Sequence, residues 1–190
     1  VGVRHFKSKN GQTNSRARNH CFLGLCHSAD QIKHSLIIFR IQIKDAVNLC
    51  LGDHQSMTLG EGAAMLLLET EEAALARGAR PRVELAGFGT TSDAGDIVRP
   101  DAAGAAGAME AALADAGLDA RDVDYVNAHG TGTILNDRSE SEALRRVFGG
   151  RLDTLAVSST KPVHGHTLGA AGALELVITA RALQDAFAPP

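Results

Sequence analysis

The sequence contains few cysteines and no long apolar run. Its three cysteines are odd in number and unevenly spaced, which argues against a disulfide framework and suits a reducing cytoplasm. They form no recognisable zinc spacing with the neighbouring histidines; the cysteines are Cys21, Cys26 and Cys50. The most apolar late stretch, residues 168–183, is interrupted by charged residues and is too short to span a bilayer. We therefore expect a cytoplasmic chain with no metal site and no membrane segment.

The chain also lacks a strong excess of charge of either sign. Its formal net charge of -3 over 190 residues gives no electrostatic reason to expect nucleic acid or an anionic membrane as a partner. Residues 1–20 are polar and basic and lack the apolar run of a secretion signal. With 44% hydrophobic residues, the chain is long enough for one globular domain with a core. Its expected partners are therefore small molecules or proteins.

Lysine is almost absent after residue 55. Lys161 is the only lysine there, although ten arginines follow that point, and all three cysteines lie before it. Alanine is rare before residue 55 and dominant after it. Two stretches of DNA with different codon usage would produce such a break in composition. We interpret residues 1–55 as an atypical N-terminal segment that arose by a frameshift, an insertion or a mis-joined reading frame, and residues 56–190 as a separate domain. The alternative is a genuine basic N-terminal arm, and we assign residues 1–55 no function.

Hydrophobic patterning predicts strands that alternate with helices in residues 56–190. The expected strands are residues 63–68, 82–88, 123–128 and 155–158, each a short run rich in apolar residues. The expected helices are residues 69–78, 102–116, 140–148 and 168–187. Asp137 precedes the third helix with the D-x-x-E spacing of a capping box to Glu140. This alternation indicates a layered α/β architecture.

Two loops that follow predicted strands carry reactive side chains. Residues 129–133 read HGTGT after the third strand, and residues 159–166, which contain Lys161 and His166, follow the fourth. Reactive groups in α/β folds usually lie at the carboxyl ends of strands, and histidine is the side chain best suited to exchange protons near neutral pH. A histidine there can also be structural, and a lysine is ordinarily a solvated surface charge. Lys161, however, is the sole lysine in an arginine-rich segment, which indicates a need for a compact ammonium.

Several motifs in these loops together resemble those of the β-ketoacyl synthases, including the ketosynthase domains of polyketide synthases. Their order and spacing both fit the family, and GEGA at residues 60–63 extends the similarity upstream to about Met57. GHTLGAAG is loosely shared with thiolases, whereas HGTGT favours the decarboxylating condensing enzymes. The resemblance implies the thiolase-like layered αβαβα fold, with its C-terminal half only. The motifs are HGTGT (129–133), ND (136–137), SSTK (158–161) and GHTLGAAG (165–172).

The resemblance also implies roles for individual residues. His129 and His166 match the two histidines that hold the malonyl thioester carbonyl while carbon dioxide leaves. Lys161 matches the lysine that organises the site, and Glu140 is placed like the acidic residue that pairs with it. Asp137 is a supporting residue beside them.

Two threonines and a further histidine complete this set. Thr131 and Thr133 match threonines that hydrogen-bond the phosphopantetheine arm of the substrate. We interpret His164 as structural and expect no metal pair between it and His166. No cofactor is expected, because the resemblance implies substrates carried on the phosphopantetheine of an acyl carrier protein.

The sequence contains no match for the nucleophilic cysteine of the family. None of the three cysteines stands in the family's Ala-Cys-Ser-like context, so we assign no nucleophile. The resemblance therefore implies a truncated C-terminal part of an acyltransferase that is a homodimer in the family. Its reaction is the decarboxylative Claisen condensation of an acyl thioester with malonyl-acyl carrier protein, and we expect this chain alone not to catalyse it. The motifs fit fatty-acid, polyketide and nodulation-type enzymes equally.

Two other interpretations remain open at this point. The first is a non-catalytic chain, either a fragment or a cysteine-less partner subunit like that of a ketosynthase heterodimer. The second is a thiolase-like acyltransferase that does not decarboxylate its substrate.

Overall fold

A mixed sheet of five strands forms the centre of the molecule. The computed structural model describes residues 2–5, 20–23, 57–96 and 99–190, and the sheet has the order β3-β1-β2-β4-β5. Strands β2, β4 and β5 run parallel to one another, whereas β1 is antiparallel to both β2 and β3. The strands are β1 (Gly2–His5), β2 (His20–Leu23), β3 (Val83–Gly87), β4 (Tyr125–Asn127) and β5 (Ala156–Ser158).

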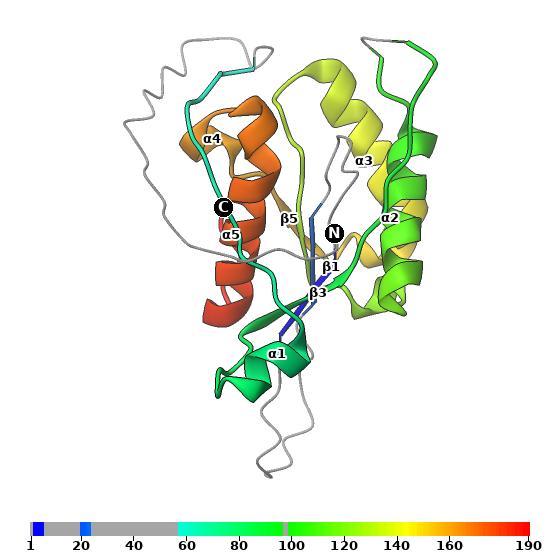
Figure 1. The fold of residues 1–190 in the computed structure, drawn as a ribbon. Coiled ribbons are helices and arrows are strands. Elements are labelled where there is room, and N and C mark those ends of the chain that lie inside the picture. The colour runs from blue at the N-terminus through cyan, green and yellow to red at the C-terminus, as the bar shows by residue number, and fades with distance from the viewer. Residues whose placement is uncertain (1, 6–19, 24–56, 97–98) are drawn as a thin grey trace.

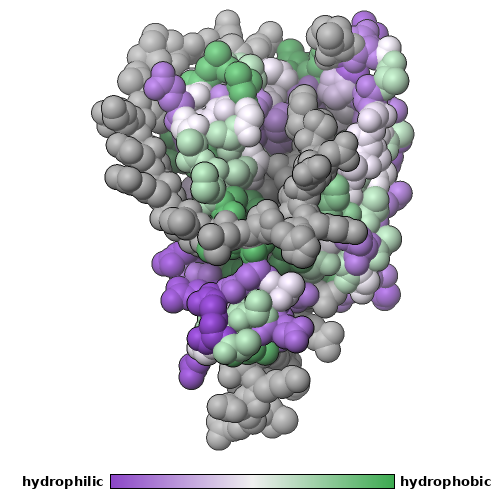
Figure 2. All heavy atoms as spheres, viewed as in Figure 1, coloured by the Kyte–Doolittle hydropathy of each residue, from purple (hydrophilic) through white to green (hydrophobic). Residues whose placement is uncertain are grey.

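Helices cover both faces of this sheet (Figure 1). On one face α2 (Ala102–Ala116) and α3 (Ile134–Phe148) pack against each other, and α5 (Ala171–Asp185) lies on the other. Two shorter helices are α1 (Glu71–Ala76) and α4 (Lys161–His164). Hydrophilic residues gather over α1 (Figure 2), of which only Ala74 is buried. Among the described residues, no helix is both long and apolar enough to cross a membrane.

Local sequence signals explain the bounds and the close packing of α2. The Asp101 side chain accepts a hydrogen bond from the amide of Ala103 at 2.9 Å, and Gly117 ends the helix with φ +61°. A Cβ at Gly87 would lie 2.5 Å from the carbonyl oxygen of Ala112, and one at Gly89 would lie 2.2 Å from that of Ala108. Only glycine allows the end of β3 to lie so close to the helix backbone.

The main apolar core lies between α2, α3 and the sheet. It contains Met109 and Leu113 from α2, Val126 from β4, and Leu144 and Phe148 from α3, all buried. On the opposite face, buried Asn127 at the end of β4 donates from Nδ2 to Thr179 Oγ1 of α5 at 3.2 Å. These contacts fix α3 and α5 relative to β4, from which the first of the two motif loops departs.

Most predicted elements after residue 80 are confirmed. The predicted helix at 102–116 matches α2, and the strands predicted at 82–88, 123–128 and 155–158 contain β3, β4 and β5. The helix predicted at 168–187 is divided into a 3-10 turn, Leu168–Ala170, and α5.

Two predicted elements differ from the structure. No strand is formed by residues 63–68, of which only Leu68 lies in a β-bridge. Helix α3 begins at Ile134 rather than at 140, with Thr133 as its N-cap residue. The capping box predicted between Asp137 and Glu140 is therefore wrong, because both residues lie inside the helix.

Strands β1 and β2 come from the segment to which the sequence assigned no function. They lie between β3 and β4 in the sheet. Cys21 lies in β2, and Cys26 and Cys50 lie outside the described residues.

Candidate functional site

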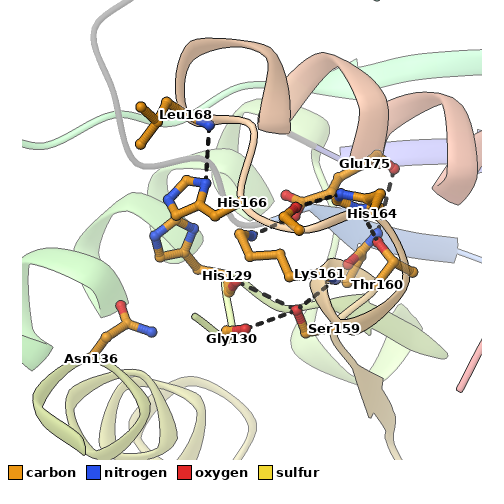
Figure 3. Close-up of polar contacts among 12 residues, drawn as sticks. His129, Gly130, Asn136, Ser159, Thr160, Lys161, His164, His166, Leu168 and Glu175 are labelled. Carbon is orange, nitrogen blue, oxygen red and sulfur yellow. Dashed lines mark hydrogen bonds and ion pairs between the residues drawn. The ribbon is translucent and has the colours of Figure 1, made fainter. Parts of the chain in front are cut away.

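The two motif loops leave neighbouring parallel strands at the same edge of the sheet. β4 ends at Asn127 and β5 at Ser158, and the amide of Ala128 donates to the carbonyl oxygen of Ser158 at 2.8 Å. His129 and Lys161 therefore leave adjacent strand ends and lie close together (Figure 3). The structure thus brings together the residues that the sequence singled out.

The imidazole rings of His129 and His166 face one another in this site (Figure 3). Their centroids are 5.2 Å apart and the rings are nearly perpendicular, at 86°. The amide of Leu168 donates to His166 Nδ1 at 3.2 Å. Nδ1 is therefore the acceptor, and neutral His166 carries its proton on Nε2. Leu168 has φ +50°, a left-handed conformation that leucine rarely adopts.

The surroundings of His166 oppose its protonation. Burial lowers the pKa of His166 below the ordinary value, and the positive charge of Lys161 and the neighbouring His164 lower it further. His166 is thus suited to act as a neutral hydrogen-bond donor through Nε2.

Lys161 forms an ion pair with Glu175 inside the protein. The two side chains are 5% and 2% exposed, and Figure 3 shows the lysine extending from α4 toward Glu175 of α5. Burial raises the pKa of Glu175, and the hydrogen bond from Lys161 opposes this rise. The expectation that Glu140 pairs with Lys161 is wrong, because Glu175 occupies that position.

Sequence reasoning missed Glu175, although the sequence contained a signal for it. A glutamate within the apolar stretch 168–183 has to be exposed or paired, because an isolated carboxylate is very costly to bury.

Glu140 instead holds the loop that carries His129. Its two carboxylate oxygens accept hydrogen bonds from the amides of His129 and Gly130, at 2.7 and 2.9 Å. The position of Glu140 on α3 thereby fixes the backbone at the first histidine. Asp137 lies in the preceding turn of α3 and accepts a hydrogen bond from Asn136 Nδ2 at 3.0 Å.

Ser159 joins the two loops; the sequence placed it in the SSTK motif but assigned it no role. Its hydroxyl oxygen lies 3.1 Å from the carbonyl oxygen of Gly130 and 3.4 Å from that of His129. A Cβ at Gly130 would lie 2.4 Å from the Ser159 Cβ, and Gly130 has φ +43°. The loops can approach this closely only with glycine at position 130.

The remaining predicted residues also lie on these loops. The hydroxyl oxygens of Thr131 and Thr133 are 2.9 Å apart and hydrogen-bonded to each other. His164 is buried; its Nδ1 donates to the carbonyl oxygen of Gly165 at 2.7 Å, and its Nε2 accepts from Thr160 Oγ1 at 3.0 Å. Burial lowers the pKa of His164, and the structural role of this residue stays a prediction. Within the described part of the chain, no group of three or more His, Cys, Asp or Glu residues could hold a metal ion.

The sequence of this chain is similar to a protein family and to several of its relatives. The family model described as "Beta-ketoacyl synthase, C-terminal domain" matches residues 82–190. Nodulation protein E of Rhizobium sp. (strain N33) is 49% identical over 151 residues, which are 80% of this chain and 38% of the relative. The 3-oxoacyl-[acyl-carrier-protein] synthase 2 of Staphylococcus aureus (strain COL) is 45% identical over 134 residues, which are 70% of this chain and 32% of the relative.

A solved structure shows the same similarity. A complex of a type II polyketide synthase acyl-carrier protein with its ketosynthase, bound to a hexaketide, matches with a TM-score of 0.65 and 34% identity. The match covers 68% of this chain and 32% of that one. The chain thus spans about a third of the length of the relatives it matches, 38% and 32%.

The match to nodulation protein E also bears on the composition break. Its 151 residues are more than the segment from Met57 to Pro190 contains, so it includes residues before Met57. The domain boundary near residue 55 stays a prediction.

Proposed function

Because this chain belongs to the β-ketoacyl synthase family and has the α/β thiolase-like fold of its C-terminal part, we propose that its site binds a malonyl thioester and promotes its decarboxylation. The observation that carries this proposal is the pair of imidazoles, His129 and His166, with ring centroids 5.2 Å apart beside the buried ammonium of Lys161. In the whole protein this step would supply the nucleophile for condensation with an acyl thioester.

The arrangement suits the charge that develops during decarboxylation. The bond between the α-carbon and the carboxylate breaks, carbon dioxide leaves, and the electron pair passes to an enolate whose oxygen is the former thioester carbonyl. Donors that already point at this oxygen stabilise the transition state without reorganisation. His166 offers its Nε2 proton, since Nδ1 accepts from Leu168, and His129 would supply the second donor from the facing ring.

Lys161 acts on this step through its charge. It is paired with Glu175 and lowers the pKa of His166, so it helps to keep that imidazole neutral. A neutral imidazole can donate a hydrogen bond to the developing enolate oxygen and keep its proton.

The enolate has two possible fates. In condensation it attacks the carbonyl carbon of an acyl thioester held on a cysteine, a carbon–carbon bond forms, and the cysteine thiolate leaves. In the absence of an acyl group it takes a proton from water and yields the acetyl thioester. None of the three cysteines stands in the family's Ala-Cys-Ser-like context, and this chain spans only 38% of nodulation protein E. We therefore place the cysteine nucleophile of the whole protein outside these 190 residues.

The proposed carrier of the malonyl group is an acyl carrier protein. The Staphylococcus aureus relative is named for this carrier, and the solved polyketide complex contains one. Thr131 and Thr133 would hydrogen-bond the phosphopantetheine arm from the loop next to His129. The reaction class is acyl transfer in fatty-acid, polyketide or nodulation-factor synthesis.

Release of carbon dioxide from malonyl-pantetheine by the full chain tests this proposal. His129→Ala should reduce the rate by about 100-fold or more, as loss of one donor to an oxyanion does. Lys161→Ala should also reduce the rate, because the positive charge that helps to keep His166 neutral is lost. Arg181→Ala is the control, because Arg181 is exposed on α5 and its ion pair with Asp185 is also exposed. Decarboxylation that is unaffected by both site substitutions would refute the assigned roles, and acyl exchange without carbon dioxide release would favour a thiolase-like reaction. Condensation by this chain alone would refute the placement of the nucleophile.

A further inference from the structure

Residues 58–62, here called the glycine clamp, lie along the loop that carries His166. The amide of Gly60 donates to the carbonyl oxygen of His166 at 3.1 Å, and the amide of His166 donates to that of Thr58 at 2.7 Å. Leu59 and His166 thereby form a parallel bridge. Both backbone hydrogen-bonding groups of His166 are thus bound to a segment that is distant in sequence.

Two glycines lie back to back at the centre of this contact. A Cβ at Gly60 would lie 2.1 Å from the carbonyl oxygen of His164 and 3.0 Å from Gly165 Cα. In the other direction, a Cβ at Gly165 would lie 2.7 Å from Gly60 Cα, and Gly165 also has φ +71°. Every one of these neighbours is backbone, so no side-chain rotation could relieve the overlap. Any larger residue at either position must push the two segments apart.

The clamp continues past this contact to α5. A Cβ at Gly62 would lie 3.3 Å from Thr167 Cγ2 and 3.1 Å from Leu174 Cδ1. Thr167 and Leu174 are both buried. Within the loop itself, His164 is fixed by hydrogen bonds to Thr160 and Gly165. The loop therefore has packed or hydrogen-bonded neighbours on both sides of His166.

We propose that the glycine clamp positions His166 for reaction by holding its backbone. This inference rests on the proposed function, because it assigns His166 a reacting partner. His129 is placed by Glu140 and Ser159, whereas His166 lies on a different loop. The clamp thus supports His166 directly through its backbone. A displacement of about 1 Å between a catalytic group and its substrate can lower a rate by about 100-fold.

Gly60→Ala in the full chain tests this role. We expect kcat for malonyl-pantetheine decarboxylation to fall by about 100-fold while KM changes by less than about threefold, because the donor is lost mainly from the transition state. Gly150→Ala is the matched control: a Cβ at Gly150 meets no atom within 4 Å, and Gly150 has no positive φ. The control should keep the kcat of the unaltered chain.

The pKa of the His166 imidazole, measured by NMR, separates positioning from a general loss of stability. Partial burial of the imidazole lowers this pKa in the unaltered chain. Release of the loop in Gly60→Ala should admit water and raise the pKa toward the ordinary value, and Gly150→Ala should leave it unchanged. A folded Gly60→Ala variant with unaltered kcat and unaltered His166 pKa would overturn the proposal.

Amide hydrogen exchange in the unaltered chain tests the clamp even where the variant does not fold. The amides of Gly60 and His166 should both be protected and should open with the same free energy, because one separation breaks both hydrogen bonds. Exchange of either amide at an unprotected rate would overturn the proposal. Absence of decarboxylation by the unaltered chain would instead count against the proposed function alone, since the pKa and exchange measurements do not depend on it.

Discussion

His166 combines two properties that a hydrogen-bond donor to an enolate needs. The amide of Leu168 fixes which ring nitrogen carries the proton, and burial together with the charge of Lys161 disfavours the imidazolium form. Protonation would put a hydrogen on Nδ1, where the Leu168 amide now donates. The active form of the site is therefore the one with neutral His166.

This argument predicts the acid side of the pH–rate profile. Because the pKa of His166 is lowered from 6.5, neutral His166 persists to a lower pH than an ordinary histidine would allow. We expect kcat/KM for malonyl-pantetheine decarboxylation to fall with decreasing pH, with a midpoint below 6.5, the unshifted value. A midpoint at or above that value would contradict the assignment of neutral His166 as the donor.

Among the helices and strands, the sequence predicted those features that are determined by residues close to each other in the chain. The bounds of α2 follow from Asp101 and Gly117, which act within one turn of the helix. β4 and β5 are short apolar runs next to the motif loops, so the order of strand and loop predicted that His129 and Lys161 each follow the end of a strand. That the two residues belong to one site was implied by the resemblance to the β-ketoacyl synthases, and the pairing of β4 with β5 brings them together.

The elements that sequence reasoning misplaced depend on distant contacts. The start of α3 was misread because Glu140 resembles a capping residue, whereas its carboxylate binds the amides of His129 and Gly130 across the site. Residues 63–68 look like a buried strand, but the segment before them is held by the His166 loop rather than by the sheet. Glu175 could be recognised as the partner of Lys161 only once α4 and α5 were placed side by side.

The buried pair of Lys161 and Glu175 should be a strong link between α4 and α5. Removal of one partner leaves the other charge buried without compensation, so Lys161→Met and Glu175→Leu should each reduce the free energy of unfolding by about 3–5 kcal/mol. Lys161→Met/Glu175→Leu should recover most of this loss while abolishing decarboxylation, since the double variant has no buried charge. Equilibrium unfolding in urea measures all three values. If the double variant lost as much unfolding free energy as the two single variants together, the two charges would not be energetically coupled, contrary to this prediction.

The Lys161→Met variant should also acquire a dependence of stability on pH. Burial raises the pKa of Glu175, and without the ammonium this effect is no longer opposed. A carboxyl whose pKa is raised in the folded state contributes stability below its unfolded pKa and loses it as the pH rises through the folded value. The loss in the free energy of unfolding that Lys161→Met causes should therefore grow with increasing pH. A loss that became smaller with increasing pH would contradict this account.

For the molecule as a whole, three separate segments of the chain converge on one edge of the sheet. The first is the glycine clamp, the second is the loop held by Glu140, and the third is the loop with Lys161 and His166. Helices on both faces of the sheet hold these segments: α3 carries Glu140, and α5 carries Glu175. The two histidines thus come from different loops with different supports, and they serve one reaction only if they act on the same substrate oxygen.

Decarboxylation of malonyl-pantetheine by His129→Ala, His166→Ala and the double variant tests this central claim most directly. If both imidazoles hold one thioester oxygen, loss of either removes most of the benefit of the other, because groups that act as a unit show strongly non-additive effects. We predict that kcat/KM of the double variant lies within about threefold of the slower single variant. Losses that multiply in the double variant would show that the two histidines act independently and would contradict the account.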